Sequence, residues 1–297
     1  MKEKEGPIVY KGMTAEQLGD AYNVFLTIPD PMGWLQANRV RAQLVEAELK
    51  PIKDLAYGEE PIQKLDIYAP KDAKNAPVLI DIHGGGWTAG SKNPRALQAQ
   101  SVNAIGAIWV PIDYGLAPEY SMDQMIDHVR RAISWIYRNI AQYGGDPDQL
   151  FVFGNSAGAH LAGTALMPAW PHKYGIPENV IKGAVLTSGV FDLEVVLHAL
   201  PGPQEALKMT LAYALHASPI LHLPEHLIPI IVAYGQDELE GFILESKNYA
   251  LALKKAGFDV TLIEVPAAHH FDMINELANT HGQLFKAVKK MLIGRMH

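Results

Sequence analysis

The sequence contains no cysteine, which excludes disulfide bonds and thiolate chemistry. It has no apolar run that approaches the length of a membrane span. It also lacks an excess of positive charge: 25 Lys and Arg stand against 32 Asp and Glu, and the net charge of −7 argues against a nucleic-acid-binding surface. Charged residues are sparse at 19%, whereas hydrophobic residues make up 48%. This composition is typical of a globular protein with a well-buried core.

Residues 1–7 carry mixed charges, and no apolar stretch of signal-peptide length follows them. We therefore expect a cytoplasmic protein without nucleic-acid or membrane partners. No repeat or long linker divides the chain. The 297 residues are predicted to form one domain (1–297), in which residues 1–60 provide a helical cover and residues 192–227 a short helical insertion.

Helical patterns dominate the first 60 residues. Thr14 is predicted to cap a helix that runs to Phe25, with Gln17 at the capping-box position. Pro29 and Pro31 are then expected to break the chain, and a second helix is predicted over residues 34–50.

From residue 62 onward, strand and helix patterns alternate. An apolar stripe within residues 122–141, for example, repeats at intervals of three and four residues. This alternation predicts an α/β fold with a mostly parallel sheet and helices on both faces, in which functional sites form at the carboxyl ends of strands. The predicted strands are 63–68, 78–83, 105–112, 150–153, 181–187, 229–234 and 260–265.

The most informative segment is residues 154–158, Gly-Asn-Ser-Ala-Gly, between an apolar strand and a helix of small residues. This order predicts a nucleophile elbow, a strained turn that lifts the hydroxyl of Ser156 clear of the sheet. The flanking glycines are expected because a side chain at Gly154 or Gly158 would clash with the neighbouring strand or helix. The pentapeptide also occurs by chance, so its interpretation depends on finding partners for the serine.

A glycine run, His83-Gly-Gly-Gly-Trp87, directly follows a second apolar strand. Acyl transfer develops negative charge on the carbonyl oxygen and requires fixed hydrogen-bond donors there. We assign these donors to the backbone N–H groups of Gly84, Gly85 and Ala157. The alternative is a tight loop that only requires positive φ angles. His83 is interpreted as a structural residue that fixes this loop.

The general base is expected late in the chain, in the loop that contains His269 and His270. We select His270, which directly precedes Phe271. Adjacent histidines also occur in metal sites, but no further ligand stands at suitable spacing, so no metal is predicted. For the carboxylate that orients the imidazole we select Asp237, early in the turn after strand 229–234, with Glu238 and Glu240 as competitors.

These motifs resemble those of α/β-hydrolases of the hormone-sensitive-lipase-like esterase group, and most closely the bacterial arylformamidase-like (kynurenine-formamidase-type) members. The resemblance covers residues 60–290 and includes the glycine run, the stretch 113–119 (Asp-Tyr-Gly-Leu-Ala-Pro-Glu) and the elbow. It implies an α/β-hydrolase fold with a small helical cover and a catalytic set of Ser156, Asp237 and His270. It implies no cofactor and suggests a homodimer.

The sequence departs from the family at two places: Gly115 stands where arginine is common, and Asn155 stands where Asp, Glu or His is frequent. Asn155 lies beside the nucleophile and is a candidate pocket residue. Trp87 and Trp34 are further candidates, although core packing explains both tryptophans as well.

The function predicted is a serine hydrolase that cleaves small carboxylic esters through an acyl-enzyme intermediate. An amidase or arylformamidase that acts on N-formylkynurenine-like compounds, other aryl amides or carbamates is the alternative. A catalytically silent hydrolase fold used as a binding module is the least favoured hypothesis, because no position of the catalytic set is lost.

Overall fold

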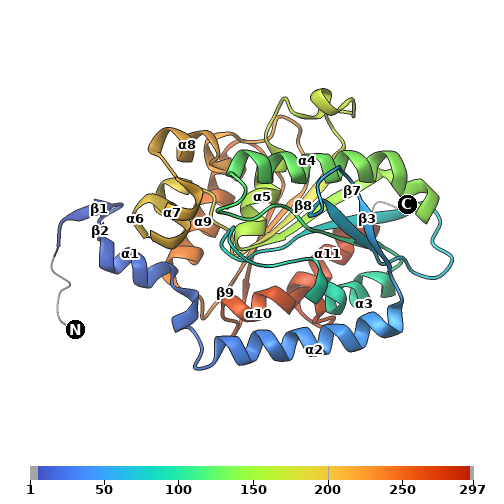
Figure 1. The fold of residues 1–297 in the computed structure, drawn as a ribbon, viewed down its shortest axis with the longest axis horizontal. Coiled ribbons are helices and arrows are strands. Elements are labelled where there is room, and N and C mark those ends of the chain that lie inside the picture. The colour runs from blue at the N-terminus through green and yellow to red at the C-terminus, as the bar shows by residue number, and fades with distance from the viewer. Residues whose placement is uncertain (1–5, 200, 295–297) are drawn as a thin grey trace.

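The computed structural model describes residues 6–199 and 201–294, which fold around one eight-stranded sheet (Figure 1). The strands lie in the spatial order β10-β9-β8-β7-β5-β6-β4-β3. The six strands from β10 to β6 are parallel, and β4 and β3 join the edge beside β6 in antiparallel pairing. Their bounds are β3 Ile52–Ala56, β4 Lys64–Ile67, β5 Ala76–Ile82, β6 Ile108–Ile112, β7 Gly145–Asn155, β8 Ile181–Thr187, β9 Ile230–Gly235 and β10 Val260–Val265.

Helices cover both faces of this sheet (Figure 1). On one face lie α4 (Met122–Asn139), α5 (Ala157–Leu166) and α9 (Glu240–Lys255). On the other lie α2 (Pro31–Leu49), α3 (Ala96–Ala104), α10 (His270–Asn275) and α11 (Gln283–Ile293). The predicted α/β architecture with a mostly parallel sheet is therefore confirmed.

The side chains of each central strand contribute to two hydrophobic cores, one on each face of the sheet. Leu150 and Val152 of β7 face the core that contains α4 and α5, whereas Phe151 and Phe153 face the core that contains α3 and α11. Successive side chains of a strand point to opposite faces, so a strand buried on both sides must be apolar throughout. This is why these apolar strands showed no alternation in the sequence.

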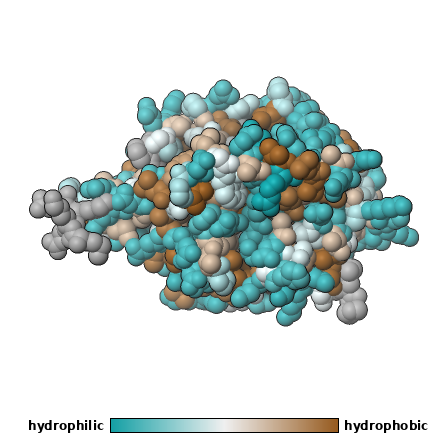
Figure 2. Space-filling model, turned by 90° about the horizontal axis from the view of Figure 1, so that it is seen from below, coloured by the Kyte–Doolittle hydropathy of each residue, from teal (hydrophilic) through white to brown (hydrophobic). Residues whose placement is uncertain are grey.

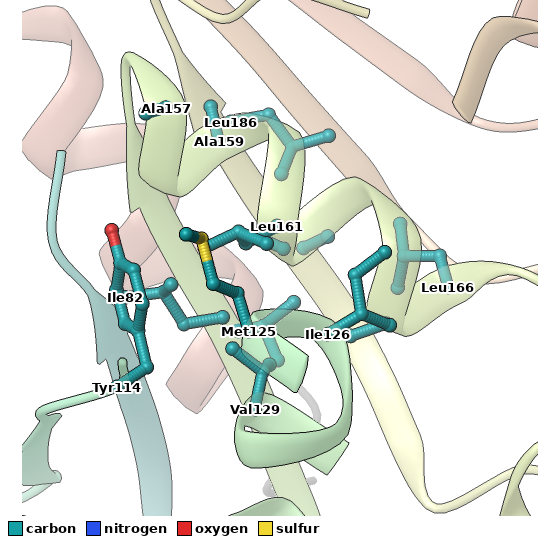
Figure 3. Packing of buried hydrophobic residues seen from close by; sticks show 14 of the residues in the cluster. Ile82, Tyr114, Met125, Ile126, Val129, Ala157, Ala159, Leu161, Leu166 and Leu186 are labelled. Atoms are coloured by element: carbon teal, nitrogen blue, oxygen red, sulfur yellow. The ribbon is translucent and has the colours of Figure 1, made fainter. Parts of the chain in front are cut away.

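The helix that follows the elbow lies in the centre of the molecule. All ten residues of α5 are buried, and Figure 3 shows Leu161 of α5 packed near Met125 of α4. The predicted stripe of α4 is buried as expected, and Ser121 and Gln124 form a capping box at its start. This packing holds the N-terminus of α5 firmly against the sheet.

The N-terminal residues differ from the prediction in their boundaries. Helix α1 (Ala15–Tyr22) is capped by Thr14 with Gln17, as predicted, but ends three residues before Phe25. Pro31 does not break the chain; it begins α2 at the first helical position, where the missing N–H of proline costs nothing. A short two-stranded sheet, β1 (Ile8–Tyr10) and β2 (Met13–Thr14), and the edge strand β3 were not predicted within residues 1–60, because they are only two to five residues long.

Helix α2 is a surface helix that packs on α3. Its outer side exposes Met32, Val40 and Leu44 among polar residues, and Figure 2, which views the molecule from below Figure 1, shows apolar and polar residues interspersed over this face. Only Asn38 and Ala42 of α2 are fully buried.

Short helices make up the insertion between β8 and β9: α6 (Val196–Ala199), α7 (Pro201–Leu207) and α8 (Leu211–His216). The N-terminal segment packs against it through α1, which contacts α6 and also α9. Tyr10 donates a hydrogen bond of 2.6 Å to the carboxylate of Asp192, and Lys11 forms an ion pair with the same carboxylate at 2.8 Å. The N-terminal segment therefore contacts both the insertion and α9 of the main body.

A buried carboxylate lies beneath this junction. Glu245 on α9 is 4% exposed and accepts hydrogen bonds from the backbone N–H groups of Phe191 (2.8 Å) and Asp192 (2.9 Å). Burial raises the pKa of Glu245 to about 7, and the two amide donors offset only part of this effect. The folded state therefore retains a proton that the unfolded chain releases at lower pH.

We predict that Glu245→Gln changes how stability depends on pH. The unfolded chain loses the Glu245 proton near pH 4.5 and the folded protein near pH 7, so the carboxyl lowers the stability of the wild type as pH rises through this window. Glutamine retains an oxygen acceptor and does not ionise. The free energy of unfolding of the variant minus that of wild type should therefore increase by about 2 kcal/mol from pH 5 to pH 8, as measured by urea denaturation at each pH. Glu48→Gln, at an exposed site, is the control, and an equal pH dependence of wild type and Glu245→Gln would contradict the prediction.

Candidate active site

Ser156 occupies the turn between β7 and α5, as predicted. Its backbone has φ +56° and ψ −126°, a conformation that a residue with a side chain rarely adopts and that stores strain. The N–H of Ser156 donates to the carbonyl of Thr187 on β8 at 2.9 Å, which fixes the turn to the neighbouring strand. The half-buried serine thus has the geometry of a nucleophile elbow.

The two flanking glycines are required by close contacts. A Cβ atom on Gly154 would lie 2.2 Å from the carbonyl oxygen of Gly158, and one on Gly158 would lie 1.9 Å from that of Ile82. Both distances are far inside van der Waals contact, so the expected steric reason for these glycines is confirmed. Strand β5 and helix α5 are therefore in direct backbone contact below the serine.

The glycine loop after β5 passes directly against the elbow. A Cβ atom on Gly84 would lie 3.1 Å from Cβ of Ser156 and 2.6 Å from the carbonyl oxygen of Asn155. Gly85 has φ +120°, which favours glycine. Within residues 6–199 and 201–294, the N–H groups of Gly84, Gly85 and Ala157 have no hydrogen-bond acceptor. The three predicted donors are therefore free to bind an anion.

His83 anchors this loop instead of acting at the serine. Its Nδ1 lies 2.8 Å from the carbonyl oxygen of Gly84, its ring stacks on Tyr114 at 4.3 Å, and the Tyr114 hydroxyl donates to the His83 carbonyl at 2.7 Å. Burial lowers the pKa of His83 to about 4, so its ring is neutral at physiological pH. These contacts agree with the structural role expected from the sequence.

His270 begins α10 and is 5% exposed. Its Nδ1 lies 2.8 Å from Oε1 of Glu238, which is itself 8% exposed. The second oxygen of Glu238 accepts a hydrogen bond from the backbone N–H of Gly235 at 3.3 Å. A buried carboxylate at Nδ1 fixes the tautomer of the imidazole and leaves Nε2 free to accept a proton.

The selection of Asp237 as this carboxylate was wrong. Asp237 is exposed, and its carboxylate makes no hydrogen bond or ion pair within the described part of the chain. The N–H of Asp237 donates to the carbonyl of Ala268, and the N–H of Glu238 donates to that of Gly235. This turn directs Asp237 outward and Glu238 inward, and the longer glutamate side chain spans the remaining distance to His270.

The loop that carries Glu238 is tied to the loop that carries His270. Asp237 donates its N–H to the carbonyl of Ala268, as described above. In addition, the N–H of Gln236 donates to the carbonyl of Val265 at 2.9 Å, and the Gln236 side chain accepts from the N–H of Ala267 at 3.2 Å. Phe242 packs on the imidazole with a ring separation of 4.3 Å. The acid and the histidine are therefore held as one unit.

His269 caps a helix and does not contact Glu238 as His270 does. Its Nδ1 accepts a hydrogen bond from the N–H of Asp272, which makes His269 the N-cap of α10. The choice of His270 over His269 is thus supported by the contact with Glu238.

Of the three candidate pocket residues, two are internal. Trp87 is 1% exposed, with its indole N–H directed at His160, and Asn155 is 2% exposed, with its amide donating to the Thr187 hydroxyl at 3.1 Å. Trp34 is half-buried, packs on Phe271 and lines a hollow of about 530 Å³ between α2 and residues 265–283. Core packing therefore explains Trp87 and Asn155, and Trp34 borders an open hollow next to the histidine loop.

The glycine loop, Ser156, Glu238 and His270 follow β5, β7, β9 and β10, respectively. These strands are parallel, so all four segments lie at the carboxyl edge of one sheet. Among the described residues, no helix is long and apolar enough to cross a membrane, and no group of three or more His, Asp or Glu side chains is arranged to hold a metal ion.

The chain is similar in sequence to known esterases and formamidases. The model of the BD-FAE family matches residues 65–239. A kynurenine formamidase of Danio rerio is 34% identical over 264 residues, covering 87% of this chain and 86% of that protein. Esterase LipQ of Mycobacterium tuberculosis is 34% identical over 240 residues, which cover 74% of this chain and 57% of LipQ.

Solved structures show the same fold. A putative thioesterase from Silicibacter sp. has a TM-score of 0.78 at 23% identity and covers 93% of this chain and 98% of that one. A hyperthermophilic esterase from Pyrobaculum calidifontis has a TM-score of 0.65 at 22% identity and covers 85% of this chain and 92% of that one. The family match, the formamidase relatives and the shared fold together show that this chain is a hydrolase and belongs to the BD-FAE family of α/β-hydrolase esterases.

Proposed function

We propose that the protein hydrolyses small carboxylic esters, with Ser156 as nucleophile, His270 as general base and Glu238 as the carboxylate that orients the base. The N–H groups of Gly84, Gly85 and Ala157 form the oxyanion hole. One observation carries the proposal. The strained turn at Ser156 lies against the glycine loop, whose amides are free, and the buried His270–Glu238 pair lies at the same edge of the sheet.

The reaction follows from these roles. Oγ of Ser156 attacks the ester carbonyl, and its proton passes to Nε2 of His270. The carbonyl oxygen becomes an anion, to which the free amides donate. His270 returns the proton to the departing alcohol, which leaves an acyl group on Ser156. Water then gives a proton to His270, attacks the acyl carbon and releases the carboxylic acid, and the proton returns to Ser156.

Arylformamide hydrolysis is a second candidate, and the observation that favours it is 34% identity to kynurenine formamidase over 87% of this chain. The steps are the same, except that His270 protonates an aromatic amine instead of an alcohol. The mycobacterial esterases that also match this chain favour the ester.

A substrate screen tests the proposal and separates the two candidates. We expect the purified protein to hydrolyse p-nitrophenyl acetate or butyrate and to react covalently with a fluorophosphonate probe, because only an activated serine reacts. Formyl-anilides are tested in parallel, and a higher kcat/KM for formyl-anilides than for every ester would replace the first candidate by the second. Absence of both hydrolysis and labelling would support a silent binding module instead.

The substrate is a small molecule, and the net charge of −7 opposes binding to nucleic acid. A cytoplasmic location and a homodimeric state stay predictions, the second of which light scattering of the purified protein would measure.

A further inference from the structure

His160 lies one helical turn after Ser156 on α5 and is completely buried. Both of its ring nitrogens have partners: Nδ1 lies 3.2 Å from Nε1 of Trp87, and Nε2 lies 2.8 Å from the carbonyl oxygen of Ala217. An indole nitrogen only donates and a carbonyl only accepts, so Nε2 of His160 carries the proton and Nδ1 accepts. Burial lowers the pKa of His160 to about 4, and the ring therefore stays neutral in this single tautomer at physiological pH.

Trp87 is the last residue of the glycine loop, and its side chain anchors that loop. It has φ +61°, which is uncommon for a residue with a side chain, and it follows Gly85 and Gly86, which also have positive φ. The glycines offer no side chains to hold the loop, whereas the Trp87 indole is 1% exposed and meets His160 edge-on at 5.5 Å. The Trp87 indole is therefore a second side-chain anchor of the loop besides His83, and among the described residues its only polar partner is His160.

The second partner of His160, the carbonyl of Ala217, lies in a segment that is itself held by hydrogen bonds. Ala217 directly follows α8 in the insertion, and the next residue, Ser218, donates through its hydroxyl to the carbonyl of Ala214 and accepts from the N–H of Leu193. His160 thus links three segments far apart in the sequence: the glycine loop, the first turns of the nucleophile helix and the insertion.

We propose that His160 is a positioning residue for the oxyanion hole: through Trp87 it fixes the N–H groups of Gly84 and Gly85 relative to Ser156. This inference rests on the proposed function. The donors of an oxyanion hole act at the position that the oxygen occupies in the transition state. A small displacement of the loop therefore weakens binding of the transition state more than binding of the substrate. Loss of His160 should therefore lower kcat and leave KM nearly unchanged.

The experiment compares His160→Phe with His160→Gln on a short p-nitrophenyl ester, with active enzyme counted by fluorophosphonate titration. Phenylalanine keeps a buried ring but loses both hydrogen bonds, and we expect kcat to fall about 10- to 100-fold with KM within about threefold. Glutamine has an amide that can donate to Ala217 and an oxygen that can accept from Trp87, so it should restore kcat to within about fivefold of wild type.

Two tryptophan variants provide a matched comparison. Trp87→Phe removes the same hydrogen bond from the other side and should lower kcat as His160→Phe does, while the double variant should lose little more than either single one. Trp170→Phe removes another buried indole hydrogen bond, 2.9 Å to the Ala165 carbonyl near the far end of α5, and should leave kcat unchanged. Trp87→Phe and His160→Gln also keep the inference testable if His160→Phe does not fold.

A trifluoromethyl ketone inhibitor gives a readout that a purely structural role would not move, because its adduct with serine places an oxyanion in the hole. Its Ki should rise in His160→Phe by about the factor by which kcat/KM falls. Wild-type kcat in His160→Phe, or an equal loss in Trp170→Phe, would overturn the inference while leaving the proposed function intact. A wild-type protein that neither hydrolyses esters nor reacts with fluorophosphonate would instead refute the proposed function.

Discussion

Ser156→Ala is expected to lower kcat for ester hydrolysis by about 10⁴- to 10⁶-fold, because the acyl-enzyme cannot form without the hydroxyl. The residual rate would come from the oxyanion donors and from substrate binding. Initial rates on p-nitrophenyl acetate, corrected for the spontaneous reaction, measure the loss. Covalent labelling by a fluorophosphonate should disappear in the same variant.

Ser188→Ala is the matched control. Ser188 directly follows β8, the strand beside β7, and it also has a positive φ, +51°. It is completely buried, and its hydroxyl has no hydrogen-bond partner among the described residues. Activity in Ser188→Ala should stay within about threefold of wild type, since its hydroxyl performs no step of the reaction. Full activity in Ser156→Ala would remove the assignment of the nucleophile.

The second large effect is expected at Glu238. Glu238→Gln keeps the size of the side chain but replaces the carboxylate at Nδ1 of His270 by an amide. The amide cannot stabilise the charged imidazolium and can favour the wrong tautomer, so kcat should fall about 10³- to 10⁴-fold. The variant should fold normally, because glutamine fills the same volume and can still accept from the N–H of Gly235.

Asp237→Asn tests the same turn one residue earlier. Asp237 is exposed and does not contact His270, so its variant should retain activity within about twofold of wild type. Glu238→Asp is an informative intermediate: it keeps the charge but is one methylene too short, and its kcat should lie between those of Glu238→Gln and wild type. A large loss in Asp237→Asn together with an active Glu238→Gln would reverse the assignment of the acid.

The carboxylate was the least predictable member of the site. Asp237, Glu238 and Glu240 lie within the five residues that follow β9, and their order in the chain does not say which one points inward. The backbone bonds from Gln236 and Asp237 to residues of the histidine loop decide this, and those partners lie about 30 residues away in the sequence. The role of Trp87 was ambiguous for a similar reason, because His160 becomes its partner only when α5 packs beside the glycine loop.

The sequence by itself determined the alternation of strands and helices, the elbow at Ser156, the glycine loop and the loop that carries His269 and His270, because each depends on local rules: apolar periodicity, the conformational freedom of glycine and the order of segments along the chain. Only the tertiary structure decided that Glu238 faces His270, that Trp87 and Asn155 are internal, and that His160 links the loop to the insertion. These outcomes depend on which side chain of a turn or helix faces a distant segment. Adjacent residues of a turn, such as Asp237 and Glu238, can point in opposite directions, and the local sequence pattern does not distinguish them.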